Sequence, residues 1–168
     1  NDIREDAQKA WTRYFAKKGI SKSTYFLDSI VDLVKKYKEE GVSVFPPNID
    51  IVTGGFPCQD FSVAGKRMGF ASDKSHNGAR IIDDNTPSVE SRGQLYMWLR
   101  EVVEITKPKV FIAENVKGLV NLKDVKSIIE KDFSSVCDNG YVVLEGRVFH
   151  AADYGVPQSR ERVFFFGF

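Results

Sequence analysis

The chain has 168 residues, of which 42% are hydrophobic and 28% charged, the proportions of a soluble globular protein with a core of its own. Its 24 Lys and Arg residues and 23 Asp and Glu residues leave a formal charge of +1, which excludes a surface that is basic throughout. A polyanionic partner would therefore have to meet a local patch. We expect no membrane span or signal peptide, because no apolar run approaches the ~20 residues that cross a bilayer.

Two cysteines, Cys58 and Cys137, are too few for a disulfide framework, and they form no metal-binding set with the histidines. We therefore expect no metal and a reducing compartment, the cytoplasm.

Two helices and a strand are predicted in the first third of the chain. Apolar residues at helical spacing predict a short loop end followed by a helix within residues 1–18. A second helix is predicted over residues 28–40, with Asp28 or Ser29 as its cap. The β-branched residues that follow predict a buried strand over residues 49–53.

Residues 54–90 show no sustained period of either kind. Loops longer than ~12–15 residues are uncommon unless they are functional or disordered. This segment carries charges of both signs, so we expect a polar, flexible catalytic-loop region over about residues 54–90. We expect the flap over residues 65–92 to close when a ligand binds.

The second half of the chain predicts further elements: a helix over 91–106, a strand over 110–113, a helix over about 121–136, and extended runs over 141–149 and 162–168. The joint between the last two runs has no room for a crossover helix, so they should pair antiparallel. The sequence thus predicts an α/β fold with Rossmann-like layers: one domain over residues 1–168, whose mostly parallel sheet carries a terminal antiparallel hairpin.

A lone cysteine directly follows the first predicted strand, in Gly54-Gly55-Phe56-Pro57-Cys58-Gln59. In open α/β sheets ligands bind beyond the carboxyl ends of the strands. Pro57 fixes its own backbone and restricts Phe56, so Cys58 lies in a rigid turn and is a candidate nucleophile. The alternative is a small buried hydrophobic side chain, which is what most free cysteines are.

Two further motifs carry polar side chains, Glu114-Asn115-Val116 and Gln158-Ser159-Arg160-Glu161-Arg162. The first ends a predicted strand at the same sheet edge as Cys58. A thiol, a carboxyl group and two guanidinium groups suit covalent catalysis on an electron-poor ring. Alternatively, Glu114 is an exposed carboxylate and the two arginines form a solvated charge cluster with Glu161. The aromatic run Phe164-Phe165-Phe166 is interpreted as a buried strand.

Taken together and in this order, these motifs resemble those of the cytosine-5 DNA methyltransferase family: Pro-Cys-Gln, Glu-Asn-Val and Gln-x-Arg-x-Arg. The resemblance extends over nearly the whole chain and includes Ser91-Arg92-Gly93, Lys107-Pro108-Lys109-Val110 and Ala152-Asp153-Tyr154-Gly155-Val156-Pro157. It implies a methyltransferase fold, S-adenosylmethionine as methyl donor, and double-stranded DNA with a target cytosine as partner.

The resemblance also implies roles for the site residues. Cys58 would add to carbon 6 of a flipped-out cytosine, and Glu114, held protonated, would donate to ring nitrogen 3. Arg162 matches the arginine that binds the cytosine carbonyl oxygen, and Arg160 matches one that supports the site and a nearby phosphate. Asn115 would orient the loop that carries Glu114.

For the cofactor, the resemblance matches Asp2 to the acidic residue that holds the ribose hydroxyls and places Ile3 beside the adenine. The remaining matched residues of this pocket are Asp28, Ser29, Pro57 and Leu95.

The chain also departs from the family pattern, because it contains no Gly-x-Gly, target-recognition region or closing cofactor motif. We therefore expect a partial catalytic core, incomplete at both ends, and expect the 168 residues alone not to methylate DNA. A second chain or segment would then supply the missing parts. Three interpretations stay open: a bacterial DNA-modification enzyme, a tRNA cytosine-5 methyltransferase, and a non-catalytic subunit that binds a partner chain.

Overall fold

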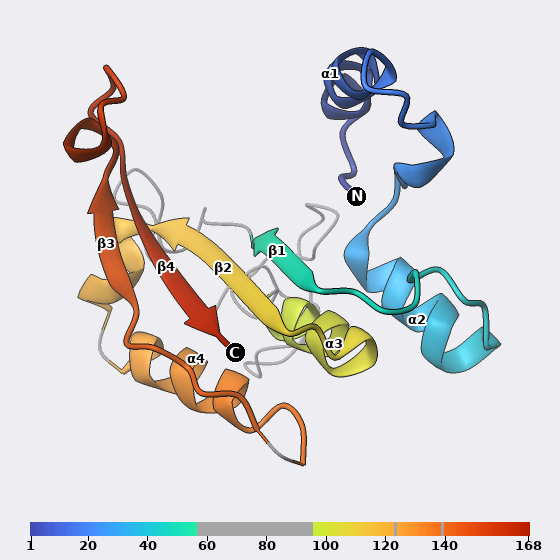
Figure 1. Cartoon of the computed structure of the whole chain (residues 1–168). Coiled ribbons are helices and arrows are strands. Elements are labelled where there is room, and N and C mark those ends of the chain that lie inside the picture. Colours follow the sequence, from blue (N-terminus) through green and yellow to red (C-terminus); the bar gives the residue numbers. More distant parts are fainter. Residues whose placement is uncertain (57–95, 123, 139) are drawn as a thin grey trace, which may run out of the picture. The chain divides into compact units, whose positions relative to one another are not determined.

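The computed structural model describes residues 1–56, 96–122, 124–138 and 140–168 (Figure 1). The chain divides into two compact units, Asn1–Phe45 and Pro46–Phe168. The expectation of one domain over residues 1–168 stays a prediction. So does the flexible flap, since residues 57–95 lie outside the described residues. Within the described ranges, no helix has the length and apolar character needed to cross a membrane.

The first unit holds two α-helices, α1 (Glu5–Ala16) and α2 (Ile30–Glu40), with a short 3₁₀ turn η1 (Lys22–Thr24) between them. Both predicted helices are confirmed. Ser29 is the N-cap of α2, because its hydroxyl accepts a hydrogen bond from the backbone N–H of Val31 at 3.2 Å. The helix ends at Gly41, whose φ of 67° is the left-handed conformation that glycine adopts without strain.

The second unit is an α/β layer structure, as predicted (Figure 1). Its elements follow the order β1 (Ile51–Gly55), α3 (Tyr96–Thr106), β2 (Val110–Val116), η3 (Lys117–Asn121), α4 (Val125–Ser134), β3 (Arg147–His150), η4 (Ala151–Tyr154) and β4 (Glu161–Gly167).

The four described strands form one sheet in the order β1-β2-β4-β3. Strands β1 and β2 are parallel, whereas β4 is antiparallel to both β2 and β3. The predicted pairing of the two last strands is confirmed. The described sheet is mixed rather than mostly parallel, because β4 inserts between β2 and β3 and adds a second antiparallel pairing.

The first strand of the terminal hairpin is shorter than predicted. Over the predicted run 141–149, only a single bridge, Val143 to Gly167, precedes β3. The ladder is interrupted at Gly146, whose backbone N–H donates to the Glu130 carboxylate on α4 at 2.7 Å. A strand loses a ladder hydrogen bond wherever its N–H points to a helix instead.

Three other elements also differ from the prediction. Strand β1 spans Ile51–Gly55 rather than residues 49–53, and it is not buried, because it lies at an edge of the described sheet with Ile51 58% exposed. Strand β2 continues to Val116, since Glu114, Asn115 and Val116 pair with Phe164, Val163 and Arg162 of β4. The Glu-Asn-Val motif therefore lies within a strand. Helix α4 begins at Val125 rather than near residue 121, because Asp124 has a φ of 62° that a right-handed helix cannot continue through.

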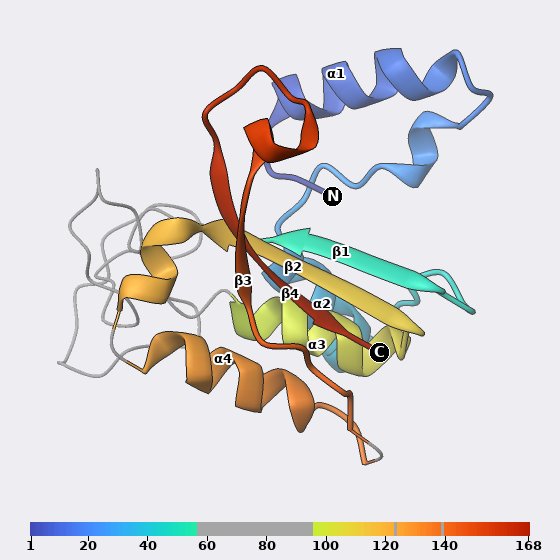
Figure 2. The ribbon, with the colours of Figure 1, turned by 60° about the vertical axis from the view of Figure 1, so that its left-hand side comes forward.

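The core of the second unit lies on one face of the sheet, and Figure 2 shows α3 and α4 together on this side. Alternate residues of β2 and β4 are fully buried here: Phe111, Ala113, Val163 and Phe165. Phe111 stacks on Phe133 of α4 with ring centroids 4.7 Å apart. The opposite face carries the half-buried alternates, which include Glu114 and Arg162.

We predict that Gly167→Ala destabilises this core. A Cβ atom at position 167 would lie 2.0 Å from Cε1 of the Phe111 ring. We expect the free energy of unfolding to fall by ~1–3 kcal/mol, the usual cost of overpacking, as measured by urea denaturation. Phe111→Leu shortens the obstructing side chain, so the double variant should lose less than the sum of the two single losses. Additive losses would contradict the close approach.

Candidate active site

The Glu114 carboxylate and the Arg162 guanidinium form the centre of the candidate site. Arg162 Nε lies 2.8 Å from Glu114 Oε1, and the two side chains are 25% and 32% exposed. The two residues come from motifs far apart in the sequence, which the β2–β4 pairing brings together. A second hydrogen bond also holds the Arg162 guanidinium: its Nη1 donates to the backbone oxygen of Glu161 at 2.8 Å.

Arg160 approaches the same carboxylate oxygen from farther away. Its Nη2 lies 3.9 Å from Glu114 Oε1, and its side chain is 48% exposed. Glu161, between the two arginines in sequence, pairs instead with Lys117 at 2.7 Å. The hydrogen bond from Lys117 holds the pKa of the Glu161 carboxyl below its ordinary value. Both arginines thus pair with Glu114, which argues against a charge cluster formed by Arg160, Glu161 and Arg162 alone.

Asn115 connects β2 to the end of β1. Its side chain is buried, with 1% of its surface exposed. Its Nδ2 donates to the backbone oxygen of Phe56 at 3.2 Å, and its Oδ1 accepts the Val116 N–H at 2.8 Å. Since Phe56 directly precedes Pro57 and Cys58, this amide fixes the backbone at the entry to the predicted nucleophile turn.

Gly55 is a site residue to which the sequence analysis assigned no role. It pairs with Glu114 in the β1–β2 register. A Cβ atom at position 55 would lie 3.1 Å from Glu114 Oε2, so a larger residue would press on the carboxylate. The Gly54-Gly55 pair before Pro57 was the signal that could have indicated this close approach.

A cavity of about 410 Å³ opens on this face of the sheet, a volume within the usual range for small-molecule pockets. Its polar lining is Glu114, Arg160 and Arg162. Its apolar lining includes Phe164 and Phe166 of β4, so the interpretation of that run as a buried strand is correct for Phe165 alone. The remaining lining residues are Ile112, Phe149, Ala151 and Tyr154.

Four of the six residues expected to hold the cofactor lie in the first unit, where two distant segments meet. Asp2 forms a parallel bridge with Leu27, and Asn1 donates its side-chain amide to the backbone oxygen of Asp28 at 2.9 Å. Asp2, Ile3, Asp28 and Ser29 therefore come together, although 24 residues separate the two pairs along the chain.

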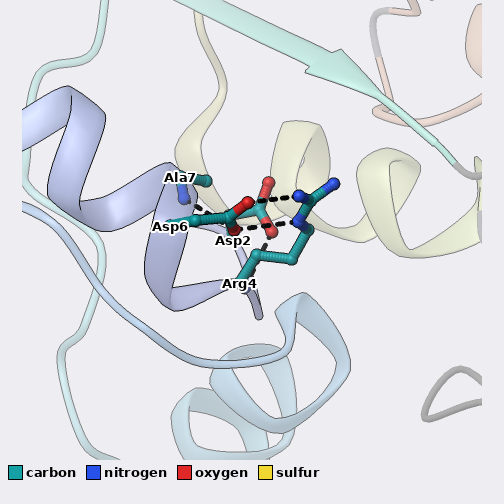
Figure 3. A network of polar contacts seen from close by, with 4 residues as sticks. All are labelled: Asp2, Arg4, Asp6 and Ala7. Atoms are coloured by element: carbon teal, nitrogen blue, oxygen red, sulfur yellow. Dashed lines mark hydrogen bonds and ion pairs between the residues drawn. The ribbon is translucent and has the colours of Figure 1, made fainter.

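Asp2 is half-buried, and the apolar side chain of the adjacent Ile3 is 59% exposed. Their roles at the ribose and the adenine stay predictions. Figure 3 shows that the Arg4 guanidinium pairs with Asp6, while Asp2 Oδ1 accepts the Arg4 backbone N–H at 3.0 Å. The hydrogen bond from Arg4 lowers the pKa of the Asp6 carboxyl. The Arg4 guanidinium also interacts electrostatically with Asp2.

Asp28 and Ser29 fit a ligand less well. Asp28 accepts from Lys36 Nζ at 2.8 Å and from the Ser29 N–H at 2.9 Å. The Ser29 hydroxyl caps α2. Their cofactor roles stay predictions. The nucleophile role of Cys58 and the cofactor roles of Pro57 and Leu95 also stay predictions, because these three residues lie outside the described residues.

The fold is that of the S-adenosylmethionine-dependent methyltransferases. A crystal structure of a protein described as a DNA modification methyltransferase encoded within an Escherichia coli prophage aligns with 84% of this chain and 32% of its own, with a TM-score of 0.51 and 26% identity. The model of the C-5 cytosine-specific DNA methylase family matches residues 3–89 and 88–168. The chain belongs to this family.

Several relatives are known as type II methyltransferases. M.HpaII of Haemophilus parainfluenzae is 36% identical over 77% of this chain, and M.NgoFVII of Neisseria gonorrhoeae is 41% identical over 72%. M.AquIA of Picosynechococcus is 40% identical over 76%. The matched regions span 31%, 27% and 47% of these three proteins, so the chain corresponds to less than half of each relative.

We predict that Asn115→Asp destabilises the second unit. The substitution removes the donor to the Phe56 oxygen and places a carboxylate against a carbonyl group. Leaving a buried polar group unsatisfied costs ~1–3 kcal/mol, which urea denaturation would resolve. Asn121→Asp, at an exposed position of η3, is the matched control and should change little. Equal stability of the two variants would contradict the role of the Asn115 amide.

Proposed function

We propose that the chain is the catalytic core of an enzyme that transfers a methyl group from S-adenosylmethionine to carbon 5 of a cytosine in double-stranded DNA. The observation that carries this proposal is the convergence of Glu114, Arg160 and Arg162 on one cavity, in a member of the cytosine-specific methylase family. The type II methyltransferases among its relatives support DNA as the substrate.

In this proposal the cytosine leaves the duplex stack, because its carbons 5 and 6 cannot be reached inside it. Cys58, as a thiolate, adds to carbon 6, and its electron pair makes carbon 5 nucleophilic. Arg162 binds the cytosine carbonyl oxygen, and Glu114 donates a proton to nitrogen 3, so that negative charge does not build up on the ring. To do this, Glu114 exchanges its contact with Arg162 for a contact with the base.

S-adenosylmethionine supplies the methyl group, and Asp2 and Ile3 are the described residues suited to hold its ribose and adenine. Loss of the carbon 5 proton to solvent after methyl transfer then returns the electron pair that expels the Cys58 thiolate, and nitrogen 3 gives its proton back to Glu114. Arg160, the more exposed guanidinium, remains available to a phosphate of the DNA backbone.

The first test uses a chimera in which this chain replaces the matched region of M.HpaII, since the chain spans only 31% of that relative. Given S-adenosylmethionine and DNA containing 5-fluorocytosine, the chimera should form a covalent adduct, because the fluorine cannot leave as a proton does. Cys58→Ser should abolish the adduct, whereas the matched control Cys137→Ser should retain it.

An adduct that persists in Cys58→Ser would overturn the assignment of the nucleophile. A folded chimera that neither traps nor methylates DNA, beside an active M.HpaII, would overturn the proposed function. Methyl transfer to tRNA but not to DNA would reassign the substrate.

We further predict that Glu114→Gln lowers turnover by ~10²–10⁴-fold, the usual contribution of a general acid, because the amide keeps the shape but cannot deliver a proton. Tritium transfer to DNA by the same chimera measures the rate. Glu145→Gln changes an exposed carboxylate paired with Lys126 and serves as the matched control. Equal turnover of Glu114→Gln and Glu145→Gln would exclude Glu114 as the acid.

A further inference from the structure

Two neighbouring glycines at the end of β1 face opposite sides of the sheet. Successive residues of a strand alternate between the two faces, so Gly54 and Gly55 have different neighbours. A Cβ atom at position 54 would lie 2.7 Å from Cδ1 of Leu99 on α3, whereas a Cβ atom at position 55 would lie 3.1 Å from Glu114 Oε2. Gly54 therefore faces the helices, and Gly55 faces the candidate active site.

The two oxygens of the Glu114 carboxylate also have different neighbours. Oε1 is the oxygen that both arginines approach, Arg162 at 2.8 Å and Arg160 at 3.9 Å. Oε2 is the oxygen that lies against Gly55. Among the described residues, and apart from the chain neighbours of Gly55, the only atoms within 4 Å of a Cβ at position 55 belong to Glu114. A methyl group added at this position would therefore act first on that residue.

The space beside Gly55 limits how the Glu114 side chain can move. The backbone of Glu114 is fixed on both sides, because it pairs with Gly55 of β1 and with Phe164 of β4. Any movement of the carboxyl group must therefore come from rotation of its side chain. A separation of 3.1 Å is already shorter than an ordinary van der Waals contact of about 3.5 Å, so a methyl group at position 55 would obstruct this rotation.

We propose that Gly55 is a positioning residue for the proton transfer: the space above its Cα atom lets the Glu114 carboxyl group turn from Arg162 to the cytosine ring. This inference rests on the proposed role of Glu114 as the acid. Gly55 takes no part in the chemistry itself and acts through Glu114. A larger residue at position 55 should therefore slow the chemical step without weakening the binding of DNA.

The first measurement tests the contact in the purified chain, without DNA or cofactor. In a Glu114→Ala background, Gly55→Ala should raise the urea midpoint, because alanine restricts the unfolded chain more than glycine does. In the parent chain this gain should be lost, since the methyl group presses on the carboxylate that Arg162 holds. Gly54→Ala is the matched control and should change the midpoint equally in both backgrounds, because its methyl group meets Leu99 instead.

The second measurement tests the consequence for catalysis in the M.HpaII chimera. A misplacement of about 1 Å can cost ~10²-fold in rate, so the smaller displacement by Gly55→Ala should lower kcat for methyl transfer by roughly tenfold. KM for DNA should not change. In Glu114→Gln, which cannot deliver the proton, Gly55→Ala should lower kcat no further. Gly54→Ala should retain the kcat of the parent chimera.

Three results would overturn the proposal. One is an equal loss of kcat from Gly55→Ala in the parent and in Glu114→Gln, because position 55 would then act through other residues. Another is an equal effect of Gly54→Ala and Gly55→Ala on kcat. The third is an equal shift of the urea midpoint by Gly55→Ala in both backgrounds. If the midpoints behave as expected but Glu114→Gln keeps the parent turnover, the contact stands and the proposed role of Glu114 fails instead.

Discussion

The antiparallel pairing of β2 with β4 is the constraint on which the candidate site depends. Directly opposite residues of two strands present their side chains on the same face, and neighbours along a strand alternate. In this register Glu114 lies opposite Phe164 and diagonal to Arg162 on the open face, with the two charged groups 2.8 Å apart. Asn115 and Val163, which are directly opposite each other, point into the core. A shift of one residue would exchange the two sets and bury the charges.

The same alternation separates two kinds of charge in the Gln-x-Arg-x-Arg motif. Arg162 belongs to the cavity, whereas the preceding Glu161 pairs with Lys117 near the end of the sheet. The bond to Lys117 keeps Glu161 from competing with Glu114 for the guanidinium groups. An exposed ion pair of this kind adds little to the free energy of unfolding. Its main effect is to leave Arg160 and Arg162 paired with Glu114 rather than with Glu161.

Much of the fold follows from local sequence patterns. Helical periodicity, a cap at Asp28 or Ser29 and the apolar runs predicted the described α-helices and strands but none of the 3₁₀ turns. The short connection after residue 150 predicted the final antiparallel pair. The sequence could not predict that β4 would lie beside β2, because that pairing joins residues about 50 positions apart and depends on the whole sheet. The sequence also did not predict that the strand ladder is interrupted at Gly146, which depends on one hydrogen bond to Glu130. Nor did it predict that α4 starts only after Asp124, which depends on one backbone angle.

The site residues that belong to recognisable motifs could be predicted from the sequence, whereas a residue that matters through packing could not. Glu114, Arg160 and Arg162 could be named from their motifs, and the structure brings them together. The importance of Gly55 appears only once β1 lies against β2, because the distance that matters is to a carboxylate on another strand.

The composition requires that a polyanionic partner meet a local positive charge, and the charges at the site include one. The chain as a whole is nearly neutral, with a formal charge of +1, so it has no general affinity for polyanions. At the cavity, however, one carboxylate faces two guanidinium groups, and the excess positive charge lies on Arg160, the more exposed of the two. Because the partly apolar cavity shields this charge less than bulk water would, a single unbalanced guanidinium can attract an anionic ligand there. Among the described residues, this local charge lies beside the carboxylate that the proposed chemistry requires.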